Sequence, residues 1–145
     1  MSDREEILDT VTRLFWFTDH HRWDELEGLF ADEVELDYTS LQGGEPETLP
    51  PADIVDGWKR TLGPLDAHQH LIADQLVSAE GDGAELTAAS QAVHQFKGET
   101  WTLGGDYRFL LTRADGGWRV ESMTMTAVWQ TGDRELVARA AGSRQ

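Results

Sequence analysis

The chain has 145 residues, a length that suits one domain with a substantial core and is too short for two. Its 27 acidic and 12 basic residues give a net charge of −15, which argues against binding to nucleic acid or to anionic membranes. The absence of cysteine excludes disulfides, thiolate metal sites and a cysteine nucleophile. No apolar run approaches the roughly 20 residues of a membrane span, and the charged N-terminus lacks a signal peptide's apolar run, so we expect a cytoplasmic protein.

The N-terminal half is predicted to be mainly helical. Ser2 and Glu5 have the spacing of a capping box, and apolar residues recur behind them at helical spacing, which predicts an amphipathic helix from residue 3 to about residue 20. The other elements expected here are a short helix over 23–30, a strand over 34–38, a loop over 41–51 and a helix that begins at Pro51.

The C-terminal half changes to a period of two, which is typical of strands. Four long strands are predicted over residues 67–79, 84–96, 100–113 and 118–130, joined by glycine-containing turns. Helices followed by an antiparallel meander indicate an α+β fold. Strands of this length twist and coil strongly, and Gly104-Gly105 is a plausible bend. We therefore expect a cone-shaped curved antiparallel sheet whose N-terminal helices enclose a pocket.

Three histidines fall on strand faces that are expected to be at least partly covered. His94 shares the more apolar face of the second long strand, and His68 shares a face of the first with His70. An internal polar group left without a partner costs roughly 1–3 kcal/mol. Asp19, at the end of the first helix, is the expected partner near the mouth of the cone. The alternative for Asp19 is an exposed carboxylate at a helix end.

Aromatic and methionine side chains supply candidate walls for the pocket. We expect the substrate pocket to be lined by Phe15, Trp58, Tyr107, Met123 and Trp129. Trp16, Trp101 and Met125 belong to the same group of apolar candidates. Residues of these types also pack as ordinary core, and this alternative stays open for each of them.

Five short segments together carry a family resemblance. They are Asp19-His20-His21-Arg22-Trp23-Asp24-Glu25-Leu26, Asp37-Tyr38, His68-Gln69-His70-Leu71-Ile72, Val93-His94-Gln95 and Gly116-Gly117-Trp118-Arg119. In this order and spacing they resemble scytalone dehydratase and, more broadly, the SnoaL-like branch of the nuclear transport factor 2-like superfamily. The resemblance covers roughly residues 5 to 132. It implies a single domain over 1–132 and a C-terminal tail over 133–145, in which a helical stretch is expected at 134–141.

The resemblance also implies roles for individual residues. In scytalone dehydratase an aspartate, two histidines and pocket tyrosines act without metal or cofactor, and these roles fall here on Asp19, His70, His94 and Tyr38. A histidine suits the task because its pKa near 6.5 lets it take and return a proton at neutral pH. The alternatives are structural or ligand-positioning histidines, and a core position for Tyr38.

Three positions depart from the family pattern. Thr18 stands where a tyrosine is expected, and Gly105 and Tyr107 stand where a serine and an asparagine are expected. We expect a cofactor-independent lyase of the dehydratase type, with a small, largely apolar, cyclic hydroxylated or ketonic substrate. The alternatives are an isomerase, a polyketide cyclase or a non-catalytic small-molecule-binding domain. By resemblance the chain is also expected to form a homo-oligomer, either a dimer or a trimer.

Two further interpretations concern the remaining imidazoles. His20 and His21 are expected to be solvated at the end of the first helix, where a cation is favoured. His68 and His70 on one strand face, joined by His94, would suit a three-histidine metal site. We expect no metal, because no clear carboxylate or supporting ligand set accompanies these three residues.

Overall fold

The first helix, α1 (Asp3–Asp19), forms where the sequence predicts it. Its N-cap is Ser2, whose hydroxyl accepts a hydrogen bond of 3.1 Å from the backbone N–H of Glu5. The structure is a computed structural model that describes residues 1–143. In the apolar stripe of α1, Ile7 and Val11 are completely buried in the core, while Leu8 is partly buried. Burial of this stripe holds the helix in place.

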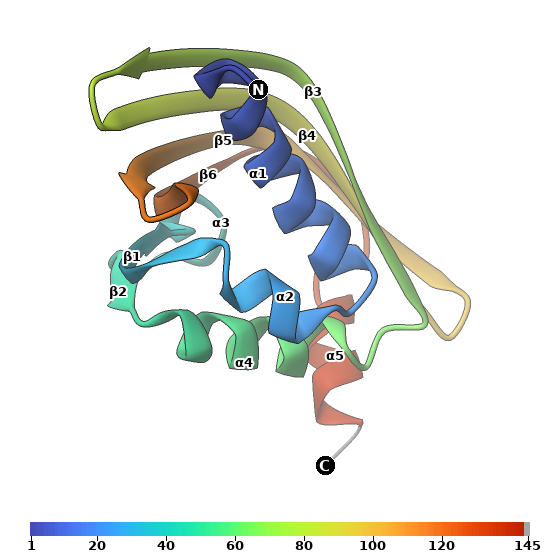
Figure 1. Ribbon diagram of the computed structural model, residues 1–145. Helices are drawn as coiled ribbons and strands as arrows, with labels where there is room; N and C mark the ends of the chain where they lie inside the picture. The colour runs from blue at the N-terminus through green and yellow to red at the C-terminus, as the bar shows by residue number, and fades with distance from the viewer. Residues whose placement is uncertain (144–145) are drawn as a thin grey trace.

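The predicted four-stranded meander is confirmed. Its strands are β3 (Ala67–Glu80), β4 (Gly83–Phe96), β5 (Glu99–Ala114) and β6 (Gly117–Gly132), and neighbouring strands pair antiparallel. The complete sheet has six strands in the order β2-β1-β6-β5-β4-β3, so β3 is an edge strand. The sheet curves strongly, and α1 lies across its concave side (Figure 1).

The second helix and the first strand differ from the prediction. Helix α2 (Trp23–Glu27) is shorter than expected, and strand β1 (Phe30–Asp37) starts earlier. Phe30 has helical spacing from Trp23, yet it pairs with Val120 in a parallel β1–β6 ladder. A long-range pairing has therefore overridden the local periodicity.

The segment predicted as a loop over 41–51 contains short regular elements. Helix α3 (Thr39–Gln42) and strand β2 (Glu47–Leu49) flank Gly43 and Gly44, both with positive φ. Strand β2 pairs antiparallel with β1 and forms the other edge of the sheet. Helix α4 (Pro51–Leu62) begins at Pro51, as predicted, and the ring of this proline suits a first helical turn.

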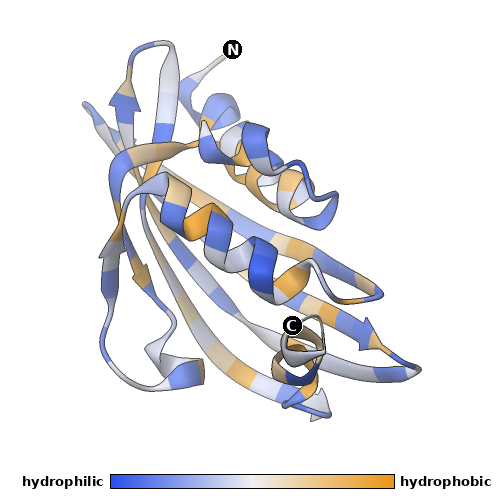
Figure 2. Cartoon of the chain, turned by 90° about the horizontal axis from the view of Figure 1, so that it is seen from below, coloured by the Kyte–Doolittle hydropathy of each residue, from blue (hydrophilic) through white to orange (hydrophobic). Residues whose placement is uncertain are grey.

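Irregularities in strand pairing accompany the curvature of the sheet. The β5–β6 register shifts between Gly104 and Gly105, and the β3–β4 register shifts between Ala73 and Leu76. Bulges of this kind bend a strand and change which face its later residues occupy. Hydrophobic and hydrophilic residues alternate along the strands, and α4 and α5 lie near the open end of the sheet (Figure 2).

The last helix, α5 (Leu136–Gly142), forms in the tail, and the side chains of Leu136 and Ala140 are completely buried. Arg139 anchors the helix by donating hydrogen bonds to Glu99, at 2.8 Å, and to Asp133. Residues 144–145 of the predicted tail lie outside the described residues. Within residues 1–143, no helix is both long enough and apolar enough to cross a bilayer.

Gly105 on β5, which lies opposite the bulge in β6, gives a stability prediction. A Cβ on Gly105 would lie 2.3 Å from the backbone oxygen of Thr126 and 2.6 Å from Met125 Cε, so Gly105→Ala forces a shift of the backbone. We expect a loss of about 1–3 kcal/mol in the free energy of unfolding. Gly57→Ala is the matched control in α4, and helix propensity predicts a gain of about 0.5–1 kcal/mol. Urea denaturation followed by circular dichroism measures both, and equal effects of the two substitutions would contradict the prediction.

Candidate active site

Asp19 and His70 form a close hydrogen-bonded pair between α1 and β3. One carboxylate oxygen, Oδ1, lies 2.7 Å from His70 Nδ1, and the other, Oδ2, accepts the backbone N–H of His70 at 2.8 Å. Only 10% of the Asp19 side chain and 11% of the His70 side chain are exposed. Because an ionised carboxylate only accepts hydrogen bonds, this contact holds a proton on His70 Nδ1 and leaves Nε2 available.

His68 joins the same cluster from the other side of the carboxylate. Its Nδ1 lies 3.4 Å from Asp19 Oδ1, and its side chain is 2% exposed. Its Nε2 lies 2.7 Å from Nε2 of His21. His21 is exposed, as expected at the end of a helix, but its ring also stacks on Trp23 and on His68 and so joins this cluster.

The other histidine at this helix end has a different environment. His20 is exposed, and its Nδ1 lies 2.8 Å from the carbonyl oxygen of Trp16. Its ring stacks on the half-exposed indole of Trp16. His20 thus stays at the surface, as expected, and takes no part in the contacts around Asp19.

The imidazoles around Asp19 keep this carboxyl ionised. Burial by itself would raise the pKa of Asp19. The side-chain contacts with His68 and His70, together with the backbone N–H of His70, lower this pKa by more than burial raises it. The net pKa of Asp19 lies well below its ordinary value. The cluster therefore holds a fixed negative charge at neutral pH behind the imidazole of His70.

His94 is buried on β4, with 5% of its surface exposed. Its Nδ1 donates a hydrogen bond of 3.0 Å to the carbonyl oxygen of Trp101, because a carbonyl can only accept, and its ring stacks on that indole. Burial lowers the pKa of His94 to about 4, with smaller contributions from His70 and His68. His94 is therefore a neutral imidazole at pH 7, and the lone pair on its Nε2 remains free to accept a proton or a hydrogen bond.

Two tyrosines bring phenol groups to the same region. Tyr38 caps α3, and Tyr107 lies on β5 against the ring of Phe15. Burial raises the pKa of Tyr107 to about 12, and it raises the pKa of Tyr38 well above its ordinary value, with Tyr107 adding to the effect. Both phenols are thus protonated at neutral pH and can donate hydrogen bonds to a ligand oxygen.

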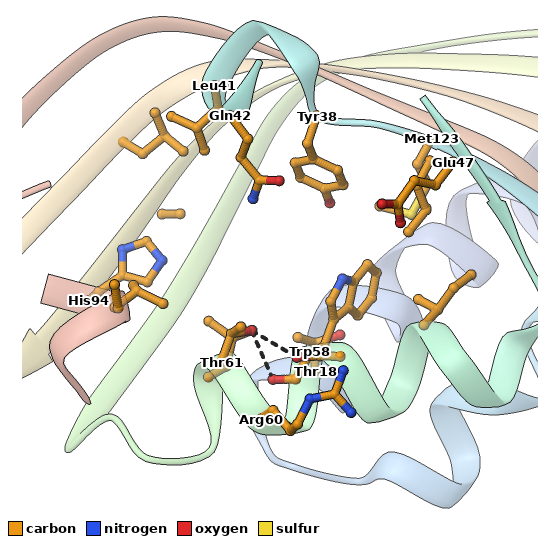
Figure 3. A pocket seen from close by; sticks show the side chains of 18 of the residues that line it. Thr18, Tyr38, Leu41, Gln42, Glu47, Trp58, Arg60, Thr61, His94 and Met123 are labelled. Carbon is orange, nitrogen blue, oxygen red and sulfur yellow. Dashed lines mark hydrogen bonds between the residues drawn. The ribbon is translucent and has the colours of Figure 1, made fainter. Parts of the chain in front are cut away.

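A cavity of about 1010 Å³ lies between the concave sheet, α1, α4 and α5. Tyr38, Trp58 and His94 point into it from different walls (Figure 3). Of the residues predicted for the site, the cavity is lined by Phe15, Tyr38, Trp58, His70, His94, Tyr107 and Met123. Asp19 is not part of the lining, because it lies behind His70 rather than at the mouth.

Trp129 lies away from the cavity, although it was expected to line the substrate pocket. Its side chain is 43% exposed and lies across Gly104, whose Cβ would fall 2.0 Å from the indole. Met125 pairs with Tyr107, but Trp129 pairs with Gly104 after the bulge. The extra residue at the bulge, Val128, reverses the alternation of β6 and turns Trp129 to the outer face.

Several cavity residues were not predicted from the sequence. Arg60 and Glu47 carry charge to the lining, and Gln42 adds an amide from the segment that was expected to be a loop (Figure 3). The last helix contributes Val137 and Ala141, which extend the wall beyond the domain expected from the resemblance. The helical spacing of residues 134–141 was the available signal, but it did not show where the helix docks.

Within residues 1–143, the side chains whose geometry could hold a metal ion are Asp19, His68 and His70. Their donor atoms all lie within 4.8 Å of one another. The three-histidine set considered from the sequence is not this group, because Nδ1 of His94 faces the carbonyl of Trp101. The carboxylate ligand that was missing from the three-histidine set is supplied here by Asp19 at the end of α1.

The neutral, buried His94 predicts a pH-dependent stability. Its folded-state pKa of about 4 lies below the ordinary histidine value of about 6.5, so the unfolded chain takes the proton first. The stabilisation is present above about pH 6.5 and is lost as the pH falls towards 4, by about 3 kcal/mol at most. Urea denaturation at several pH values measures this dependence, and His94→Gln should flatten it. An equally steep dependence in His94→Gln would show that other groups cause it.

Solved structures resemble this fold over nearly its full length. The protein Kfla4162 from Kribbella flavida is 27% identical, with 94% of this chain and 97% of that chain covered and a TM-score of 0.86. A provisional scytalone dehydratase from Novosphingobium aromaticivorans is 16% identical, covers 90% and 87%, and has a TM-score of 0.76. A type 2 hexachlorocyclohexane dehydrochlorinase (LinA) is 15% identical, covers 90% and 88%, and has a TM-score of 0.77.

The sequence itself matches one family model. No curated protein matches the chain. The model of the SnoaL-like domain matches residues 1–124, which include α1, the Asp19–His70 pair and most of the curved sheet. The α+β cone is also the fold of structures described as NTF2-like, one of them from Novosphingobium aromaticivorans with a TM-score of 0.73. The chain therefore belongs to the SnoaL-like family and has the nuclear transport factor 2-like fold.

Proposed function

We propose that the protein is a cofactor-independent lyase that removes water from a small cyclic hydroxylated ketone. The observation that carries this proposal is the 2.7 Å contact between Asp19 and His70 at the wall of a cavity of about 1010 Å³. A histidine oriented by a carboxylate is a general acid–base group. The position of His70 at the wall of a cavity lined by both apolar and polar side chains supports chemistry on a small organic molecule that carries polar groups.

In the proposed reaction, the proton that His70 removes from a carbon of the substrate is the proton that it later gives to the leaving oxygen. His70 Nε2 removes a proton from the carbon next to the carbonyl, and the electron pair of that C–H bond forms an enolate. The enolate collapses to a carbon–carbon double bond, and the C–O bond to the hydroxyl on the next carbon breaks. His70 returns its proton to the leaving oxygen and water is released. Asp19 stabilises the transient imidazolium, and its contact with Nδ1 keeps Nε2 directed to the cavity.

The neutral groups of the cavity have complementary roles in this proposal. The phenols of Tyr38 and Tyr107 stay protonated and donate hydrogen bonds to the carbonyl oxygen as negative charge develops on it. His94, with its lowered pKa, accepts a hydrogen bond from the substrate hydroxyl through Nε2. A neutral His94 is a poor acid at pH 7, which is why we assign the return of the proton to His70.

The comparisons support an elimination as the reaction class. Structures with this fold are described as dehydratases and as dehydrochlorinases, and both names denote loss of a small molecule from adjacent atoms. An isomerase or a polyketide cyclase would share the first step, proton removal beside a carbonyl. These alternatives differ only in the fate of the enolate, so the products distinguish them. A non-catalytic binding domain would hold the same molecules unchanged.

The first prediction concerns the Asp19–His70 pair. The protein is incubated with a panel of cyclic β-hydroxyketones, and the loss of water is followed by NMR. We expect both Asp19→Asn and His70→Gln to lower the rate about 10²–10⁴-fold, because the acid–base group is misoriented or absent. His20→Gln is the matched control, since this histidine lies at the same helix end but outside the contacts with Asp19.

The products also separate the alternatives. Exchange of the carbon-bound proton in D₂O without loss of water would indicate an isomerase rather than a lyase. Formation of a new ring would indicate a cyclase. Binding without any chemistry, or full activity in His70→Gln, would rule out the proposed mechanism.

A second prediction separates the cavity wall from the outer face. Tyr38→Phe removes one donor to the developing oxyanion, and we expect kcat to fall about 10²–10³-fold. Trp129→Phe changes an aromatic side chain outside the lining, so kcat should stay near the wild-type value. If the two substitutions had equal effects on kcat, the hydroxyl of Tyr38 would have no role in the reaction.

A further inference from the structure

The side chain of His68 is buried, yet one of its ring nitrogens has no hydrogen-bond partner. Its side chain is 2% exposed, and Nδ1 is the single buried side-chain nitrogen or oxygen in residues 1–143 without a hydrogen-bond partner. Leaving such a group unpaired costs about 1–3 kcal/mol. The atom faces Asp19 Oδ1 at 3.4 Å, a contact that helps to lower the pKa of Asp19 but is longer than a good hydrogen bond. A ligand between these two atoms would satisfy Nδ1.

The surrounding donors suit a metal ion. His68 Nδ1, His70 Nδ1 and an oxygen of Asp19 lie within 4.8 Å of one another and come from two rigid elements, α1 and β3. In a tetrahedral site with bonds of about 2.0–2.1 Å, neighbouring ligand atoms are about 3.3 Å apart. The Asp19–His68 separation of 3.4 Å matches this value, and the Asp19–His70 separation of 2.7 Å needs only a small opening.

The outer contact of His68 also has the form found at metal sites. A histidine that binds a metal through one ring nitrogen almost always donates its other N–H to a partner, which fixes the tautomer. His68 Nε2 lies 2.7 Å from Nε2 of His21. With a proton on His68 Nε2, this contact is a hydrogen bond to His21, and the lone pair of His68 Nδ1 faces the cluster.

We propose that Asp19, His68 and His70 bind one divalent transition-metal ion of the zinc class, with His21 as the hydrogen-bond partner of His68. Two imidazole nitrogens and one carboxylate oxygen are ligands that Zn²⁺ accepts, whereas Mg²⁺ prefers oxygen ligands alone. The site goes beyond the proposed lyase function and opposes it. With the ion on Nδ1, His70 carries its proton on Nε2 and cannot remove a proton from a substrate.

The test measures binding of ZnCl₂ to the chelator-treated protein by isothermal titration calorimetry at neutral pH. We expect one ion per chain for the wild type and no comparable binding of MgCl₂. His68→Gln should weaken the affinity for Zn²⁺ by at least about tenfold, since it removes a ligand. His21→Gln leaves all three ligands in place and alters an exposed residue, so this variant is expected to fold normally. It should weaken the affinity for Zn²⁺ about tenfold, because it changes the hydrogen-bond partner of His68.

The controls are His20→Gln and His94→Gln, which remove imidazoles outside the cluster and should leave the affinity for Zn²⁺ unchanged. Absence of Zn²⁺ binding by the wild type, undiminished binding by His68→Gln, or loss of binding in His94→Gln would overturn the proposal. Because calorimetry needs no turnover, failure of the metal site and failure of the lyase proposal are separate results. A lyase that binds no Zn²⁺ contradicts only the metal site.

Discussion

The contact between Asp19 and His70 is the constraint on which the rest of the site depends. Strand β3 is an edge strand, and the backbone N–H of His70 points away from the sheet towards α1. One carboxylate oxygen accepts this N–H, while the other holds the imidazole of the same residue. The carboxylate thus satisfies a free donor of the sheet edge, fixes the end of α1 against β3 and orients the ring. The fold and the proposed chemistry therefore share one interaction, and we expect a substitution of Asp19 to affect both.

The charge distribution follows from burial around this contact. Asp19 stays ionised because imidazoles and an N–H surround it, whereas His94, Tyr38 and Tyr107 stay neutral because burial disfavours their charged forms. The cavity therefore combines one fixed negative charge behind His70 with neutral donors and acceptors on its walls. In the proposed reaction, such an arrangement would stabilise a transient imidazolium and a developing oxyanion without a large rearrangement. The same negative charge, flanked by two imidazole nitrogens, is also what would attract a metal ion. Protons and metal ions then compete for the same ring nitrogens.

Much of this arrangement was predictable from local patterns, and the failures have physical causes. The capping box of α1 and the period of two in the four long strands indicated the elements, and Asp19 was named as the partner of a strand histidine. The early start of β1 at Phe30 was missed because its pairing with Val120 is long-range. Trp129 was placed in the pocket because a sequence does not show where a bulge reverses alternation. The contact between His21 and His68 depends on how the turn after α1 meets β3, which no periodicity encodes.

The orientation of His70 by Asp19 is tested most directly by the imidazole tautomers, measured by long-range ¹⁵N–¹H correlation NMR at neutral pH in the metal-free wild type and in Asp19→Asn. If Asp19 orients His70, Nδ1 of His70 carries a proton that is hydrogen-bonded to the carboxylate, and this signal changes in Asp19→Asn. The signals of His94 should stay the same, because its Nδ1 donates to the carbonyl of Trp101. A His70 protonated on Nε2 in the wild type, or a His70 signal that ignores the loss of the carboxylate in a folded Asp19→Asn protein, would contradict the account.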